Sequence, residues 1–183
     1  MPAPLVVPEK AKGNTLTMRL VLFATFILAL PLGAQAPLIF LLTFADTKEG
    51  TFGIRLATSM TEEKGGGGRM MNAEGKETEK NVWGKRSAWV DYCGPVDGQT
   101  VGVAIFDNPA NPRYPTYWHS RAYGLHAANI FGVRDFTGDK SQDGSLTIEP
   151  GHPLHFRYRV VIHAGDTGSA NIAELHKKYL STK

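Results

Sequence analysis

The feature that most constrains this fold is an alternation of apolar and polar residues with a period of two. It is clearest in the stretch LHFRYRVVIH, residues 154–163. Such alternation is typical of a β-strand that packs one face on a core. The apolar face comprises Leu154, Phe156, Tyr158, Val160 and Ile162, and the polar face comprises His155, Arg157, Arg159 and His163.

The same period recurs along most of the chain after residue 38. It is present in TFGIRLAT (51–58), SAWVDYC (87–93) and TVGVAIF (100–106). Turn-forming pairs such as Gly94-Pro95, Asp97-Gly98 and Asp143-Gly144 separate the runs. Short strands divided by such turns predict an all-β fold, an antiparallel sandwich or barrel.

Two further segments are expected to differ from strands. The stretch DTGSANIAELHKKYL (166–180) places Ile172, Leu175 and Tyr179 on one helical face, which predicts a short C-terminal helix capped by Thr167 or Ser169. The polar, glycine-rich residues 61–80 lack the Gly-Lys-Ser/Thr of a phosphate-binding loop. They predict a flexible connection between strands.

The first 42 residues have the arrangement of an export signal. Arg19 precedes an apolar run that ends in GAQA, where Ala34 and Ala36 fit a signal-peptidase pattern. We expect residues 1–36 to be a signal peptide and residues 37–183 to be the domain, which then works in the periplasm or is secreted. Two alternatives remain open: an uncleaved membrane anchor over residues 20–42, and a first buried strand over residues 37–44.

Charge and cysteine content narrow the function classes. The net charge of +3 comes from scattered Lys and Arg rather than a focused basic stripe, so we expect no nucleic-acid partner. The single cysteine, Cys93, excludes an intramolecular disulfide, and we take it also to exclude a cysteine-based zinc site, because such sites need several thiolates at fixed spacing. No local metal-ligand spacing or dinucleotide motif is present, and we expect neither metal nor cofactor. A metal site formed by His119, His163 and a carboxylate is the alternative, which no local spacing supports.

Three long motifs carry a resemblance to a known family. They are FADTKEGTFGIRLA (44–57), the stretch from Val82 to Gly132 that contains DNPANPRYPTYWHSRAYG, and LHFRYRVVIHAGD (154–166). They resemble the C-terminal part of the bacterial family of unknown function often labelled "methane oxygenase PmoA". The resemblance implies a β-sandwich of the galactose-mutarotase type and a truncated member of the family. A truncated sandwich exposes an apolar face, which favours a homodimer.

The family label itself does not predict the activity. The integral membrane subunit of methane monooxygenase has several spanning helices, whereas this chain has at most one apolar segment of that length. We therefore expect no methane oxygenase activity.

The polar and aromatic residues of these motifs suggest a carbohydrate site. Sugar chemistry requires an acid and a base with tuned pKa values, and we assign these roles to Glu49, His119 and His163. A sugar also needs hydrogen-bonding groups and an aromatic face. For substrate binding we assign Lys48, Trp118, Arg121, Tyr123 and Asn129.

The sequence thus predicts an exported domain that binds or processes a carbohydrate. The alternatives are a non-catalytic interaction module of the cell envelope and an inactive truncated family member. The polar face of residues 155–163 discriminates between them: a concavity shared with His119 and Glu49 favours the carbohydrate site, and a flat exposed face favours the interaction module.

Overall fold

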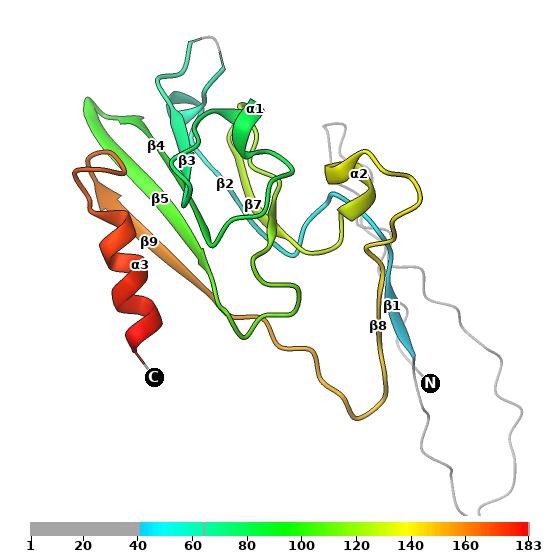
Figure 1. Ribbon diagram of the computed structural model, residues 1–183. Coiled ribbons are helices and arrows are strands. Elements are labelled where there is room, and N and C mark those ends of the chain that lie inside the picture. The colour runs from blue at the N-terminus through cyan, green and yellow to red at the C-terminus, as the bar shows by residue number, and fades with distance from the viewer. Residues whose placement is uncertain (1–40, 64, 183) are drawn as a thin grey trace, which may run out of the picture. The chain divides into compact units, whose positions relative to one another are not determined.

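The strands of this chain pair in antiparallel sheets, as the alternation predicts. The computed structural model describes residues 41–63 and 65–182 (Figure 1). The signal peptide or anchor predicted over residues 1–36 lies outside the described residues. The elements in chain order are β1 (Leu42–Phe44), β2 (Phe52–Arg55), the 3₁₀ helix η1 (Thr58–Met60), β3 (Arg69–Asn72), α1 (Glu79–Val82), β4 (Trp89–Val96), β5 (Gln99–Asp107), β6 (Tyr117–Trp118), β7 (Leu125–Asn129), α2 (Val133–Thr137), β8 (Leu146–Ile148), β9 (Tyr158–Ala164) and α3 (Ile172–Ser181).

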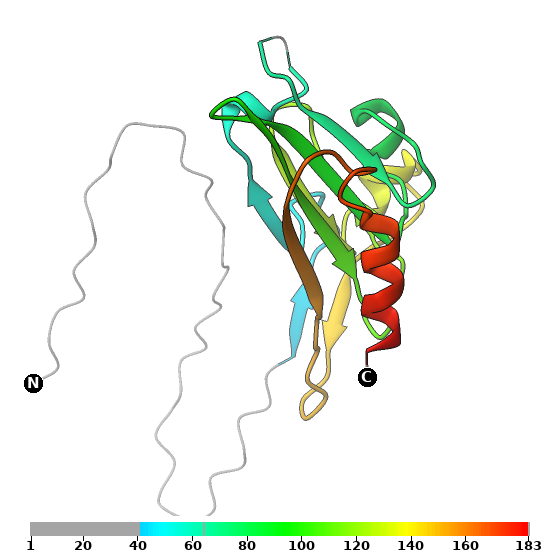
Figure 2. The same cartoon turned by 90° about the vertical axis from the view of Figure 1, so that its left-hand side faces the viewer.

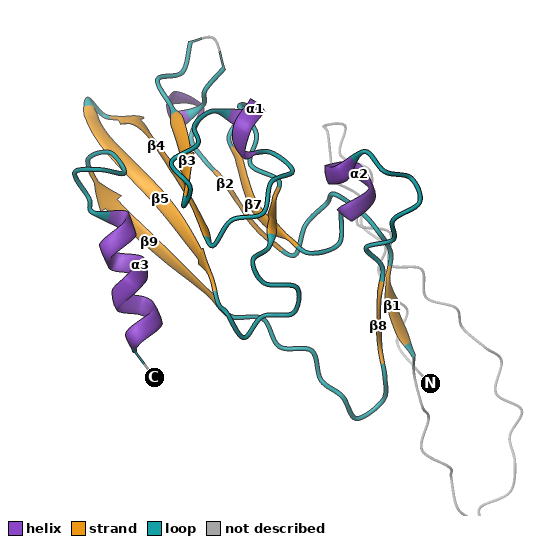
Figure 3. Cartoon of the chain, viewed as in Figure 1, coloured by secondary structure: helices purple, strands orange, loops and turns teal. Residues whose placement is uncertain are grey.

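Three sheets contain these strands. A four-stranded sheet has the order β3-β4-β5-β9, a three-stranded sheet has the order β2-β7-β6, and β1 pairs with β8. The central hairpin β4–β5 turns at Asp97 and Gly98, which both have positive φ, of 49° and 77°. Two such residues in succession are typical of the tight turn that matches the twist of paired strands. Figure 3 shows strands predominating over short helices, so the all-β prediction is confirmed.

The main core is shared by the four-stranded and three-stranded sheets. The even-numbered residues of β4 and the odd-numbered residues of β5 point into it, in agreement with the alternation. This pairing of two antiparallel sheets over a common core is sandwich-like. The core comprises Leu56, Met60, Met70, Val82, Val90, Tyr92, Ile105, Trp118 and Ala128, with Phe52, Ile54, Val101, Val103 and Tyr158 packed against it.

The C-terminal helix covers part of the opposite face of the four-stranded sheet. Figure 2 shows α3, in red, beside this sheet. Ile172 of α3 is fully buried against Trp89, Ala104 and Phe106. The predicted helix is therefore confirmed, although its contacts differ in detail. His176 rather than Leu175 continues the buried face, and no side chain caps the N-terminus, where Asn171 has a φ of 51°.

The segment 61–80 was predicted as a flexible connection, and this prediction is wrong for Arg69–Asn72, which forms β3. The strand pairs with β4 and buries Met70 in the core. The carboxylate of Glu62 holds the segment in place, because it accepts hydrogen bonds from the backbone N–H groups of Met70 (2.8 Å) and Glu79 (2.9 Å). The prediction from hydrophobic periodicity missed this strand because the hydrogen bonds that Glu62 accepts from two backbone segments leave no periodic pattern in the sequence.

Strand β9 begins at Tyr158, later than its alternation suggested. The side-chain amide of Asn111 accepts from the N–H of Arg157 (2.7 Å) and donates to the carbonyl of the same residue (2.7 Å). The amide thus satisfies the backbone of Arg157 as a neighbouring strand would. The hydrogen-bonded pairing of β9 with β5 starts at the next residue, Tyr158. Beyond this point β9 is an edge strand of its sheet.

The apolar face of β9 is only partly covered. Tyr158 packs on the core, whereas Val160 is 38% exposed and Ile162 is 79% exposed. Strand β1, the described end of the alternative buried strand over residues 37–44, is exposed along its length. Within residues 41–182, we find no helix with both the length and the apolar character needed to cross a membrane.

Candidate functional site

The motif YWHSRAYG (117–124) enters the core and then returns to the surface. Tyr117 and Trp118 form β6, and Trp118, His119 and Ser120 are buried. The chain becomes exposed again at Tyr123. Its aromatic and cationic residues therefore serve different purposes.

Trp118 is a core residue. It is fully buried, its ring stacks on His126 at a centroid distance of 5.7 Å, and its Nε1–H donates to the carbonyl of Ser87 (2.9 Å). A buried ring whose polar atom is satisfied stabilises the fold. The structure leaves no free face of Trp118 for a sugar.

His119 and Asn129 fix a neighbouring loop. The Nδ1 of His119 lies 2.5 Å from the carbonyl oxygen of Lys48, and the Nδ2 of Asn129 donates to the carbonyl of Thr47 (3.0 Å). Both side chains are buried, while the side chains of Lys48 and Glu49 are exposed. These contacts position the backbone of residues 47–49.

Arg121 and Tyr123 lie at the surface and contact each other. The guanidinium group of Arg121 forms an ion pair with Glu79 (Nε to Oε1, 2.9 Å) and lies 5.5 Å from the centroid of the Tyr123 ring. The guanidinium of Arg55 lies 4.9 Å from the same centroid and donates to the carbonyl of Tyr123 (3.0 Å). One ring thus contacts two guanidinium groups, an arrangement that restrains all three side chains.

The core holds this loop by its backbone. The hydroxyl of Tyr92 donates to the carbonyl of Ala122 (3.1 Å) and accepts from the N–H of Glu62 (3.0 Å). Burial raises the pKa of Tyr92 to about 12, so the hydroxyl keeps its proton and remains a donor at neutral pH. Tyr123 is therefore presented from a fixed backbone.

A pocket of about 410 Å³ lies beside the ring of Tyr123. We call it the Tyr123 pocket. It combines the aromatic ring and hydroxyl of a tyrosine, a guanidinium, a carboxylate and two threonine hydroxyl groups. Its lining residues are Arg55, Leu56, Thr58, Thr61, Glu63, Gly65, Gly66 and Tyr123.

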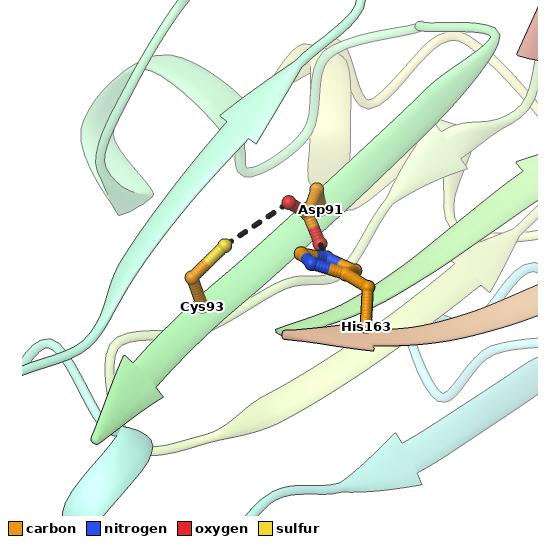
Figure 4. Close-up of side chains that lie close together, drawn as sticks. All are labelled: Asp91, Cys93 and His163. Carbon is orange, nitrogen blue, oxygen red and sulfur yellow. Dashed lines mark hydrogen bonds and ion pairs between the residues drawn. The ribbon is translucent and has the colours of Figure 1, made fainter. Parts of the chain in front are cut away.

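His163 lies on the other face of the four-stranded sheet. It pairs with Gly102 of β5, and its imidazole crosses β5 to reach β4, where Nε2 lies 3.0 Å from Oδ1 of Asp91. The thiol of Cys93 donates to Oδ2 of Asp91 (3.0 Å) (Figure 4). We call these three side chains the Asp91 cluster. Burial, reinforced by the charge of Asp91, raises the pKa of the Cys93 thiol to about 12, so it is protonated at neutral pH.

A second pocket, of about 390 Å³, opens next to the Asp91 cluster. Cys93 belongs to both. The pocket is lined by Gly67, Arg69, Met71, Cys93, Gly94, Thr100, Asp166, Thr167 and Gly168.

Comparison with known proteins places the chain in a family. The model of one family, described as a family of unknown function, matches residues 14–177. The chain belongs to this family, DUF6807. No curated protein matches it, and no solved structure does. The membership of DUF6807 thus identifies relatives of this domain without assigning an activity.

The predicted site residues of this DUF6807 domain fall into three groups. His119, Trp118 and Asn129 are buried, and the first and last of them hold the loop of Lys48 and Glu49. Arg121 and Tyr123 lie near the Tyr123 pocket, and His163 belongs to the Asp91 cluster. Among the described residues, no hydrogen bond or ring contact joins His119 to His163. The structure therefore offers two separate candidate sites.

The sequence led to no assigned site role for four residues of these sites. Arg55 belongs to the polar face of a predicted strand, Asp91 is one of the polar residues of the family-like motifs, and Cys93 is expected to be a small buried apolar residue. The signal in the sequence was the aspartate within the otherwise apolar stretch AWVDYC, because a charged residue in a buried strand requires a partner. Gly102, over which the imidazole lies, gave no signal.

Proposed function

We propose that this domain binds a carbohydrate in the Tyr123 pocket. The observation that carries the proposal is the ring of Tyr123, which contacts two guanidinium groups at the edge of a pocket that also contains a carboxylate and hydroxyl groups. Tyr123 as a whole residue is 36% exposed. Arg55 lines the pocket, and Arg121 supports the ring from outside it.

The chemistry of the lining suits a ligand rich in hydroxyl groups. A guanidinium donates to sugar oxygens in a fixed fork, and the carboxylate of Glu63 accepts from sugar hydroxyls. A volume of about 410 Å³ falls in the range of small-molecule sites. The restrained side chains lose little conformational entropy when the ligand binds, which favours affinity.

The proposal concerns binding rather than catalysis at this pocket. Acid–base processing requires an acid and a base within reach of one sugar. Glu63 is the carboxylate of the lining, whereas neither His119 nor His163 lines it. The predicted catalytic roles of Glu49, His119 and His163 therefore do not enter the proposal.

The resemblance found in the sequence supports the same ligand class. We propose that the chain belongs with the proteins labelled "methane oxygenase PmoA", whose expected fold is the galactose-mutarotase sandwich. Methane oxidation is not part of the proposed function, because the sequence carries at most one apolar segment long enough to span a bilayer.

Binding of the full chain to a glycan array, followed by calorimetry with the best glycan, tests the proposal. We expect Arg55→Ala and Tyr123→Ala each to weaken binding by about tenfold or more, the effect of losing one good polar or aromatic contact. Arg159→Ala is a matched control, because the guanidinium of Arg159 lies over the ring of Tyr179 at the same 4.9 Å. A folded, monodisperse chain that binds no glycan would contradict the proposal.

Export is proposed on the sequence of residues 18–36 alone. The test is N-terminal sequencing of the protein recovered from the periplasm and the medium of the expressing cells. We expect a mature N-terminus close to Ala36. An intact N-terminus in the membrane fraction would indicate the uncleaved anchor instead.

A second candidate function is an interaction module that pairs with a second copy of this chain. The observation that favours it is β9, which exposes Ile162 and has no second neighbouring strand among the residues that the structure describes. His155, Arg157 and Arg159 are exposed and line neither pocket described above. Light scattering of the full chain tests it: we expect a dimer that Ile162→Lys dissociates and Leu180→Lys, a change at another exposed apolar residue, does not.

A further inference from the structure

The Asp91 cluster combines three side chains of the kinds that ligate metal ions. Asp91 and Cys93 come from β4 and His163 from β9, and one ligand atom of each lies within 4.8 Å of the others (Figure 4). Residues two apart on a strand point to the same face, so Asp91 and Cys93 are side by side by virtue of their spacing. The sheet then adds His163, 70 positions from Cys93 along the chain.

A missing side chain creates the space in which the three groups meet. Gly102 of β5 is paired with Cys93 on one side and with His163 on the other. A Cβ atom at Gly102 would lie 2.3 Å from Nε2 of His163 and 3.0 Å from Sγ of Cys93. The imidazole of His163 and the thiol of Cys93 therefore occupy the space that a side chain at Gly102 would fill.

The carboxylate of Asp91 lacks a permanent cation. Asp91 is fully buried, and the partners of its side chain within the described part of the chain are the Cys93 thiol and the His163 imidazole. Neither an arginine nor a lysine pairs with it there. A buried carboxylate is costly unless a cation or several donors neutralise it, and a metal ion in contact with all three groups would do so.

We propose that Asp91, Cys93 and His163 bind a zinc ion, with a fourth position open to the adjoining pocket. Carboxylate oxygen, thiolate sulfur and imidazole nitrogen form a mixed donor set that suits zinc, and three protein ligands leave one tetrahedral position for water or another ligand. The three proposed ligands are distinct from the residues that line the Tyr123 pocket, and the inference does not rest on the carbohydrate proposal.

The surroundings of the cluster fit this role. Nδ1 of His163 lies 3.3 Å from the carbonyl oxygen of Ala164, a contact that orients the ring when Nδ1 carries the proton and leaves Nε2 for the metal. The hydroxyl of Thr167 lies 3.5 Å from Sγ of Cys93. On binding, zinc replaces the thiol proton of Cys93, which passes to solvent, and it binds Nε2 of a neutral His163 imidazole whose single ring proton then lies on Nδ1.

The open position faces polar groups. Cys93 lines the pocket of about 390 Å³ together with Arg69, Asp166 and Thr167. The expectation of no metal, drawn from the sequence, rested on the absence of a local ligand motif. The third ligand, His163, comes from a strand that is distant in the sequence. A search for locally spaced ligands therefore does not find the site.

Metal titration of the full chain tests the proposal directly. The protein is stripped with a chelator and titrated with Co²⁺, followed by Zn²⁺ competition. We expect one ion per chain and a thiolate-to-cobalt charge-transfer band that Zn²⁺ abolishes. Because the chain has a single cysteine, the band reports Cys93 alone. This measurement needs no variant, so it stands even if a substitution impairs folding.

Variants then identify the ligands. We expect Asp91→Asn, Cys93→Ser and His163→Gln each to weaken Zn²⁺ binding by at least about 100-fold, since even changes to outer-shell partners cost 10- to 100-fold. His155→Gln, a change at an exposed histidine before β9, and Arg55→Ala, which disables the Tyr123 pocket, should bind Zn²⁺ as the unmodified chain does. A folded chain that binds Co²⁺ without a thiolate band, or a Cys93→Ser chain of unchanged affinity, would overturn the proposal.

Discussion

The imidazole of His163 reaches the carboxylate of Asp91 across an intervening strand. His163 lies on β9 and Asp91 on β4, and β5 runs between them. Neighbouring strands are about 4.8 Å apart, so the two backbones are separated by roughly twice that distance. A histidine side chain spans it only because Gly102, directly beneath, has no side chain.

Gly102→Ala should therefore break this contact. The added methyl group occupies the position of the imidazole, which must rotate away from Asp91. We expect Zn²⁺ affinity to fall by at least about tenfold with a loss of stability of roughly 1–3 kcal/mol, the usual cost of overpacking. Calorimetry and thermal unfolding measure the two effects. His155→Gln, a change at an exposed histidine outside both pockets, is the control for both measurements.

His126 should make the fold sensitive to acid. Burial lowers the pKa of His126 to about 4, below the 6.5 expected for the unfolded chain. The unfolded state therefore binds more protons between these values, and the free energy of unfolding falls as the pH drops from about 6.5 to about 4. The loss is on the order of 3 kcal/mol. Burial lowers the pKa of His176 as well, which adds in the same direction.

Denaturant unfolding of the full chain at a series of pH values measures this effect. His126→Gln should flatten the pH dependence between pH 4 and 6.5 while lowering stability at pH 7, because it removes a ring packed on Trp118. His152→Gln, at an exposed site, should leave the curve unchanged. An equally steep curve in the His126→Gln chain would show that other groups cause the loss.

His119→Ala separates a structural from a catalytic role. The imidazole of His119 holds the backbone of Lys48 from a buried position. Its removal should cost about 1–3 kcal/mol of stability, the range for a lost buried hydrogen bond. Glycan binding in the Tyr123 pocket should persist at a temperature where the variant is folded. Loss of binding by the folded variant would place His119 in the ligand site.

Asn111→Ala should loosen the start of β9. The amide of Asn111 makes two hydrogen bonds with the backbone of Arg157 and one, of 2.7 Å, with the buried carboxylate of Asp107. We expect a loss of roughly 2–3 kcal/mol and faster hydrogen exchange at Arg157. Asn108→Ala alters the same loop without touching Arg157, so unchanged exchange in both variants would contradict the assignment.

The strands were predictable where local chemistry alone decides them. Val90 and Tyr92 alternate with Asp91 and Cys93, and the turn at Asp97-Gly98 sets the pairing of β4 with β5. Ile162 shows the limit of such reasoning. Its position on the apolar face was read correctly, but its burial depends on whether another sheet covers it, which no local pattern states.

The sites were less predictable, for the same physical reason. Trp118 and Tyr123 belong to one motif and are both aromatic, yet the first fills the core and the second borders a pocket. Residue type shows what a side chain is able to do, whereas its environment depends on contacts between distant segments. Asp91 and His163 illustrate this most clearly, since 72 positions separate them in the chain.

The glycine beneath the imidazole provides a marker for sorting other DUF6807 sequences. A chain that carries a bulky residue at the position equivalent to Gly102 has no room for a histidine to cross the strand. In such a chain, an aspartate, a cysteine and a histidine at the positions of Asp91, Cys93 and His163 would not form a shared site. The residue at this position, taken together with the three ligand positions, therefore shows from sequence alone which chains can form the metal site. In the other chains, the three polar residues occur without being able to bind one ion together.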